Sequence, residues 1–142
     1  MESLVKVLNL AVLGAERQLR QTYPALLTIL SKSSHPSSDW RFFMTAGGVG
    51  MYLLINKVGE KEEKEIMDQL IGRDRQEMIY AIDNLSTYLK TRKNMKLDTQ
   101  TIQQVIGFWV LWNIAGDPPT MEECKGLAPA IGMFLYNIVT NL

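Results

Sequence analysis

The fold is decided by a short motif that occurs three times: Val49-Gly50-Met51-Tyr52-Leu53-Leu54, Ile106-Gly107-Phe108-Trp109-Val110-Leu111 and Ile131-Gly132-Met133-Phe134-Leu135-Tyr136. Each copy runs from a β-branched residue through glycine and Met or Phe to an aromatic and an aliphatic residue. A glycine inside a helix costs about 1 kcal/mol relative to alanine, but it lets a second backbone or a large ring come close. We therefore expect the glycines and the adjoining aromatics to be helix-packing or interface residues, namely Gly50, Tyr52, Gly107, Trp109, Gly132 and Phe134.

The three copies lie in uncharged segments, residues 42–56, 99–116 and 126–142. Apolar residues cover most helical faces of these segments, which is typical of central helices that are surrounded by others. A helix that spans a membrane needs about 20 mostly apolar residues, and each segment falls short of that. The segments therefore predict three buried core helices, over residues 39–58, 99–115 and 130–139.

More polar helices flank this apolar centre. Apolar residues recur at helical spacing from Leu4 to Leu19, and again in residues 60–71 and 74–91, with charged residues between them. No strand pattern competes. The sequence predicts an all-α, compact, single-domain helical bundle of six or seven helices over residues 1–142. A serine-rich loop at 31–38 separates an N-terminal helical hairpin, or one helix kinked at Pro24, from the rest.

The sequence also repeats itself weakly at an offset of 57 residues. This offset aligns Gly50 with Gly107 and Asn56 with Asn113, and it aligns Gly59, the expected C-terminal stop of the first central helix, with Gly116. A duplicated helix pair and convergent core composition both account for the repeat, and the sequence leaves both open.

Bulk composition argues against several function classes. Fifteen basic and fifteen acidic residues give a net charge of zero, so there is no overall attraction to nucleic acid or to an anionic membrane. His35 and Cys124 are the sole histidine and cysteine, which is too few for a zinc site. They are also far apart in the sequence, and His35 lies in a loop without an orienting partner, which argues against a nucleophile–base pair. We expect a protein that is not an enzyme and has no cofactor or metal. The single cysteine and the absence of a signal-peptide pattern favour a cytoplasmic location.

One basic cluster stands out, Lys90, Arg92, Lys93 and Lys96. Such residues can contact phosphates, although cations are also common at the C-terminal end of a helix because of its dipole. The preferred prediction is a non-catalytic protein–protein association module that acts through apolar helix packing. It would be a small subunit, adaptor or regulator that binds a protein partner or itself as a homo-oligomer. The alternatives are a nucleic-acid-associated helical module that uses the basic cluster, and a bundle that binds a lipophilic ligand.

Overall fold

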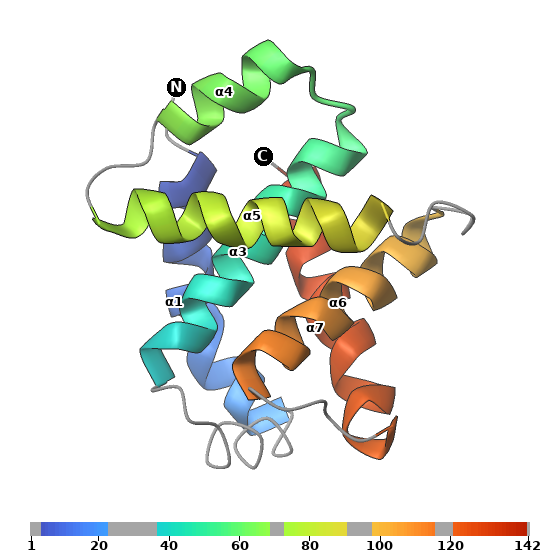
Figure 1. Ribbon diagram of the computed structural model, residues 1–142. Coiled ribbons are helices and arrows are strands. Elements are labelled where there is room, and N and C mark those ends of the chain that lie inside the picture. The colour runs from blue at the N-terminus through green and yellow to red at the C-terminus, as the bar shows by residue number, and fades with distance from the viewer. Residues whose placement is uncertain (1–3, 23–36, 69–72, 91–97, 116–120, 142) are drawn as a thin grey trace.

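The computed structural model describes residues 4–22, 37–68, 73–90, 98–115 and 121–141, and all regular secondary structure within these ranges is helical (Figure 1). The prediction of an all-α helical bundle is therefore confirmed. The helices, in chain order, are α1 (Leu4–Thr22), α3 (Ser37–Ile55), α4 (Glu60–Asp68), α5 (Arg73–Lys90), α6 (Thr99–Ala115) and α7 (Met121–Thr140).

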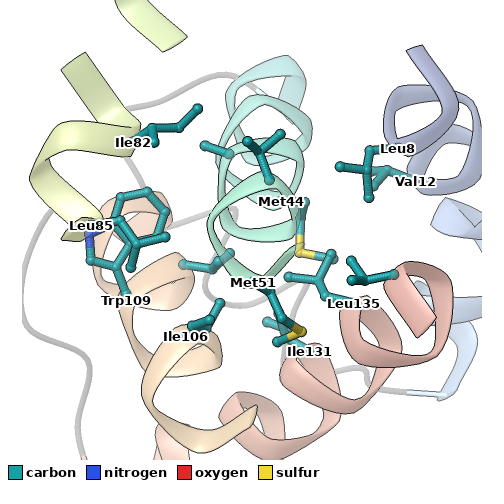
Figure 2. Packing of buried hydrophobic residues seen from close by; sticks show 14 of the residues in the cluster. Leu8, Val12, Met44, Met51, Ile82, Leu85, Ile106, Trp109, Ile131 and Leu135 are labelled. Carbon is teal, nitrogen blue, oxygen red and sulfur yellow. The ribbon is translucent and has the colours of Figure 1, made fainter. Parts of the chain in front are cut away.

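Helix α3 is the centre of the bundle and packs against α1, α5, α6 and α7 (Figure 1). Met44 and Met51 of α3 are almost fully buried, and Figure 2 shows buried side chains of the neighbouring helices around α3. These include Leu8 of α1, Leu85 of α5 and Leu135 of α7. Burial on several sides explains why the middle of α3 carries no charge.

The glycines of α3 each admit a different neighbouring helix. A Cβ added to Gly47 would lie 2.7 Å from Cγ2 of Val110 on α6, and one added to Gly48 would lie 2.7 Å from Cδ2 of Leu8 on α1. At Gly50 it would collide with Cδ2 of Leu85 on α5. Three glycines in four positions therefore let helices approach α3 from three sides, within an unbroken helix.

The C-terminal end of α3 differs from the prediction. The helix was expected to reach Val58 and to stop at Gly59, but it ends at Ile55. Lys57 adopts the left-handed conformation with φ of 47°. The amide of Val58 donates to the carbonyl of Leu53 at 3.1 Å and that of Lys57 to Leu54 at 3.3 Å, which is a Schellman ending. The predicted glycine stop is therefore wrong for Gly59. Its carbonyl instead accepts from the amide of Glu63 at 2.9 Å, so Gly59 is the N-cap of α4.

Most of the remaining helix ends are close to the predicted ones, but α7 begins at Met121, nine residues before the predicted core helix of residues 130–139. Helix α3 begins at Ser37, so Ser37 and Ser38 belong to a helix and not to the serine-rich loop; residues 31–36 lie outside the described ranges. Asp98 caps α6, since its Oδ1 accepts from the amide of Thr101 at 2.8 Å. Helix α7 continues through Pro129.

The 57-residue repeat extends to local hydrogen bonding. The Asn56 side chain donates to the carbonyl of Tyr52 at 3.0 Å, and the Asn113 side chain donates to the carbonyl of Trp109 at 2.8 Å. The helix ends do not follow the repeat, because Asn56 lies just beyond α3 whereas Asn113 lies within α6. Both accounts of the repeat, duplication and convergence, stay open.

Candidate interaction surface

Helices α6 and α7 cross with backbone against backbone. A Cβ on Gly107 would overlap the carbonyl oxygen of Ala128 and lie 2.7 Å from its carbonyl carbon. A Cβ on Gly132 would overlap the carbonyl oxygen of Gln103 in the same way. Ala128 lies four positions before Gly132, and Gln103 lies four positions before Gly107, so the two contacts are reciprocal. The chain order of the contacts is reversed between the helices, so α6 and α7 run antiparallel at the crossing. This arrangement requires glycine at both positions.

The other motif residues lie elsewhere, and no common site joins all six. Gly50 faces a side chain of α5, Leu85, where the other two motif glycines face backbone. Trp109 also faces α5, because its indole N–H donates to Oδ1 of Asn84 at 3.0 Å. Its ring stands nearly perpendicular to that of Phe43, with the two ring centroids 6.1 Å apart. Tyr52 and Phe134 are half-buried against the core. The structure therefore brings together Gly107 with Gly132 at one crossing, and Gly50 with Trp109 along α5.

One buried polar group was missed by the sequence reasoning. Thr45 of α3 is fully buried, and its hydroxyl lies 2.8 Å from Oδ1 of Asn9 on α1 and 2.9 Å from the carbonyl of Arg41. A hydroxyl has one proton to donate, so it serves one of these acceptors at a time. The contact links α1 to α3. The sequence shows a single threonine within the apolar segment of residues 42–56, but it does not show that Asn9 is its partner.

The outer face of α6, and that of α7 after Lys125, are exposed and yet uncharged. Trp112 is 44% exposed and Met133 is 52% exposed, while Phe108, Pro129 and Tyr136 are half-buried. The rings of Phe108 and Trp112 pack together with centroids 5.7 Å apart. Residues 99–115 and 126–141 contain no charged side chain. The sequence predicted apolar central helices without showing which of their faces stay exposed, and the structure exposes these residues of α6 and α7.

These exposed residues lie in two rows on the same side of the α6–α7 pair. At about 100° per residue, Gln104, Phe108 and Trp112 follow one another along α6, and Pro129, Met133 and Tyr136 follow one another along α7. Val110 and Leu135, which contact Gly47 of α3, lie on the opposite side of the crossing from these two rows. Both rows therefore lie on the side of the α6–α7 pair that faces away from α3. We call these six residues the α6–α7 outer surface.

The remaining predicted site residues are not described by the structure. Arg92, Lys93 and Lys96 lie outside the described ranges, as does His35, and the side chains of Lys90 and Cys124 are not described. Within the described part of the chain, no three acidic, histidine or cysteine side chains gather in a way that could hold a metal ion. Over the same residues, no helix has both the length and the hydropathy that a membrane span requires. The chain matches no protein-family model, no curated protein and no solved structure.

Proposed function

We propose that the protein is a non-catalytic association module that pairs with a second copy of itself through the α6–α7 outer surface. The observation that carries this proposal is that the surface lacks charge although it is exposed. Charged residues make up 21% of the chain, and the solvent-facing helix α4 is charged along most of its length. Burial accounts for the uncharged middle of α3, but it does not account for exposed positions on α6 and α7.

The chemistry of the surface suits a protein interface. The buried centres of such interfaces are rich in aromatic residues and methionine and poor in Lys, Glu and Asp. The surface contains aromatic residues and methionine, namely Phe108, Trp112, Met133 and Tyr136. Lys, Glu and Asp are absent from residues 99–115 and 126–141. An unpaired charge buried on association would be costly, so a surface that is dry in the complex is expected to lack charges.

The surface also favours self-association. A two-fold contact places a patch against its own copy, so any charged patch meets like charge unless it carries both signs. The α6–α7 outer surface has no charge and incurs no such repulsion. The crossing of Gly107 on Ala128 holds the two rows of side chains at a fixed separation, and a preorganised surface loses less conformational freedom on binding.

The test is the mass of the protein in solution as a function of concentration. Sedimentation equilibrium should show a dimer for the unchanged chain, and Trp112→Glu and Met133→Glu should each raise the dissociation constant about tenfold or more, because a carboxylate would be buried on pairing. Tyr80→Glu is the matched control, since Tyr80 is a 65% exposed aromatic residue on α5. It should leave the mass unchanged. At concentrations where the unchanged chain is monomeric, Met133→Glu and Tyr80→Glu should each change the free energy of unfolding by no more than about 0.5 kcal/mol.

Three results would contradict the proposal: a monomer at every accessible concentration, equal dissociation by the Tyr80→Glu control, or no effect of either α6–α7 variant. Salt-sensitive binding of a mixed-sequence oligonucleotide by the monomer would favour the basic cluster of residues 90–96 instead. A reducing compartment such as the cytoplasm is part of the proposal, because the sequence has a single cysteine.

A further inference from the structure

Helix α1 carries apolar residues on two opposite faces. Val5, Leu8 and Val12 are buried against the rest of the bundle. Leu10 and Leu13 point the other way and are 60% and 48% exposed, the two most exposed leucines among the described residues. Among the residues that the structure describes, the first face is buried, and Leu10 and Leu13 on the second face stay exposed.

The exposed leucines lie between two cations. Lys6, Leu10, Leu13 and Arg17 stand at positions i, i+4, i+7 and i+11, and all four are exposed. At 1.5 Å per residue the row is about 16 Å long, and its alternating spacing of four and three is the spacing with which one helix presents side chains to another. We call these four residues the α1 stripe.

We propose that the α1 stripe docks an amphipathic helix of a partner protein that has apolar residues at the same spacing and acidic residues beside both ends. The leucines supply the apolar contact, and Lys6 and Arg17 pair with the carboxylates. This surface is separate from the α6–α7 outer surface, and its role does not depend on self-association.

Charge disfavours a second copy of the stripe as the partner. In a parallel pairing Lys6 faces Lys6 and Arg17 faces Arg17, and in an antiparallel pairing Lys6 faces Arg17. Like charges meet in either case, which is unfavourable. Helix α4 of another copy is acidic, but its Ile66 is buried and its exposed positions, such as Glu62 and Glu65, are charged. Between Glu60 and Asp68, every exposed side chain of α4 is charged, so none of them is an apolar partner for the leucines.

The shape of the stripe favours a helix over a lipid surface. Helices that lie on membranes insert a broad apolar face, often with aromatic residues. The broad apolar face of α1 is already buried in the core, and two leucines in a single row leave only a narrow contact. A row of this width matches the side chains of one opposing helix.

A direct test uses a fluorescent synthetic helix about three heptads long, with leucines at the coiled-coil core positions and glutamates beside them. Anisotropy should show that the full chain binds this peptide and not its counterpart with lysines. Leu10→Gln/Leu13→Gln should weaken binding about tenfold or more, and Lys6→Glu/Arg17→Glu should transfer the preference to the lysine peptide. Raising the salt from about 0.05 to about 0.5 M should weaken binding several-fold, because the exposed ion pairs are screened.

The control variant Lys61→Glu/Lys64→Glu makes the same charge change at exposed positions of α4 and should bind the glutamate peptide as the unchanged chain does. Equal loss of binding in this control would overturn the proposal. So would the absence of an anisotropy change up to about 1 mM protein, or equal affinity for both peptides. Binding of phosphatidylserine vesicles that requires Leu10 and Leu13, or a dimer that their replacement dissociates, would assign the stripe to a membrane or to a second copy.

Discussion

Replacing Gly107 by alanine adds one methyl group where α6 and α7 lie closest. The new carbon would overlap the carbonyl oxygen of Ala128 and would lie 2.7 Å from its carbonyl carbon and 3.1 Å from its Cα, whereas ordinary contacts of a Cβ are 3.4–4 Å. All three neighbours are backbone atoms. Because no side-chain rotation can relieve the overlap, the two helices have to move apart.

The size of the effect follows from two opposing terms. Overpacking of a core costs about 1–3 kcal/mol, and we expect the upper end here because the contacted atoms belong to a helix backbone. Alanine recovers about 1 kcal/mol relative to glycine within a helix. The net loss of unfolding free energy should be about 2 kcal/mol, which lowers the melting temperature of a chain of this size by about 7 °C.

Urea and thermal denaturation of Gly107→Ala should be compared with Gly14→Ala. Gly14 lies within α1, and a Cβ there meets no atom within 4 Å. Gly14→Ala gains the higher helix propensity of alanine without a steric clash, so its free energy of unfolding should rise by about 0.5–1 kcal/mol. If Gly107→Ala were as stable as Gly14→Ala, the close crossing would be wrong. Gly132→Ala should lose about as much unfolding free energy as Gly107→Ala. The double variant should lose less than the sum of the two single losses, because the first methyl group already separates the helices.

Three further substitutions probe particular contacts by urea denaturation. Lys57→Gly should stabilise the protein by about 0.5–1 kcal/mol, because glycine adopts the left-handed conformation of Lys57 without strain; a loss would contradict this ending of α3. Trp109→Phe should cost about 1–2 kcal/mol, and a double-mutant cycle with Asn84→Ala should give a coupling energy of about 1 kcal/mol; zero coupling would show that the hydrogen bond contributes nothing. Thr45→Val should cost about 1 kcal/mol while Thr45→Ser costs less, since serine keeps the hydroxyl that reaches Asn9; the reverse order would mean that the methyl group matters more.

The fold class follows from the sequence because its cause is local. Apolar residues at helical spacing, and segments without charge, predicted the helices and identified α3 as central. The end of α3 was harder to predict. Gly59 is the better residue for a left-handed conformation, but the chain adopts it at Lys57, and Val58 packs against the core. The packing of Val58 therefore decides which residue adopts the left-handed conformation, and local propensity does not predict this tertiary contact.

The glycine motif could be located from the sequence, but its neighbours could not. The same pattern places Gly50 against a side chain and Gly107 against a backbone. A glycine indicates that a helix face is open, and the packing of the whole bundle decides what fills it. The sequence could not show that Trp112 and Met133 are exposed for a related reason. Periodicity separates inner from outer faces only where charges mark the outer one, and α6 has no charged residue and α7 has none after Lys125.

The crossing and the α6–α7 outer surface are linked through the chain itself, because Phe108 follows Gly107 and Met133 follows Gly132. A methyl group at Gly107 would move the two rows apart, so Gly107→Ala should weaken self-association even at temperatures where the variant is fully folded. Gly47→Ala provides the contrast, since its Cβ would press on Cγ2 of Val110 at 2.7 Å, on the side of α6 that faces α3. This variant should lose stability by side-chain overpacking and keep its dimer constant within about threefold, which is under about 0.7 kcal/mol. The dimer constants of both variants should be measured by sedimentation equilibrium well below their melting temperatures. A weaker dimer for Gly107→Ala alone would show that the helix crossing sets the shape of the surface, and not merely that the surface lies beside the crossing. Equal dimer constants for the two would show the latter.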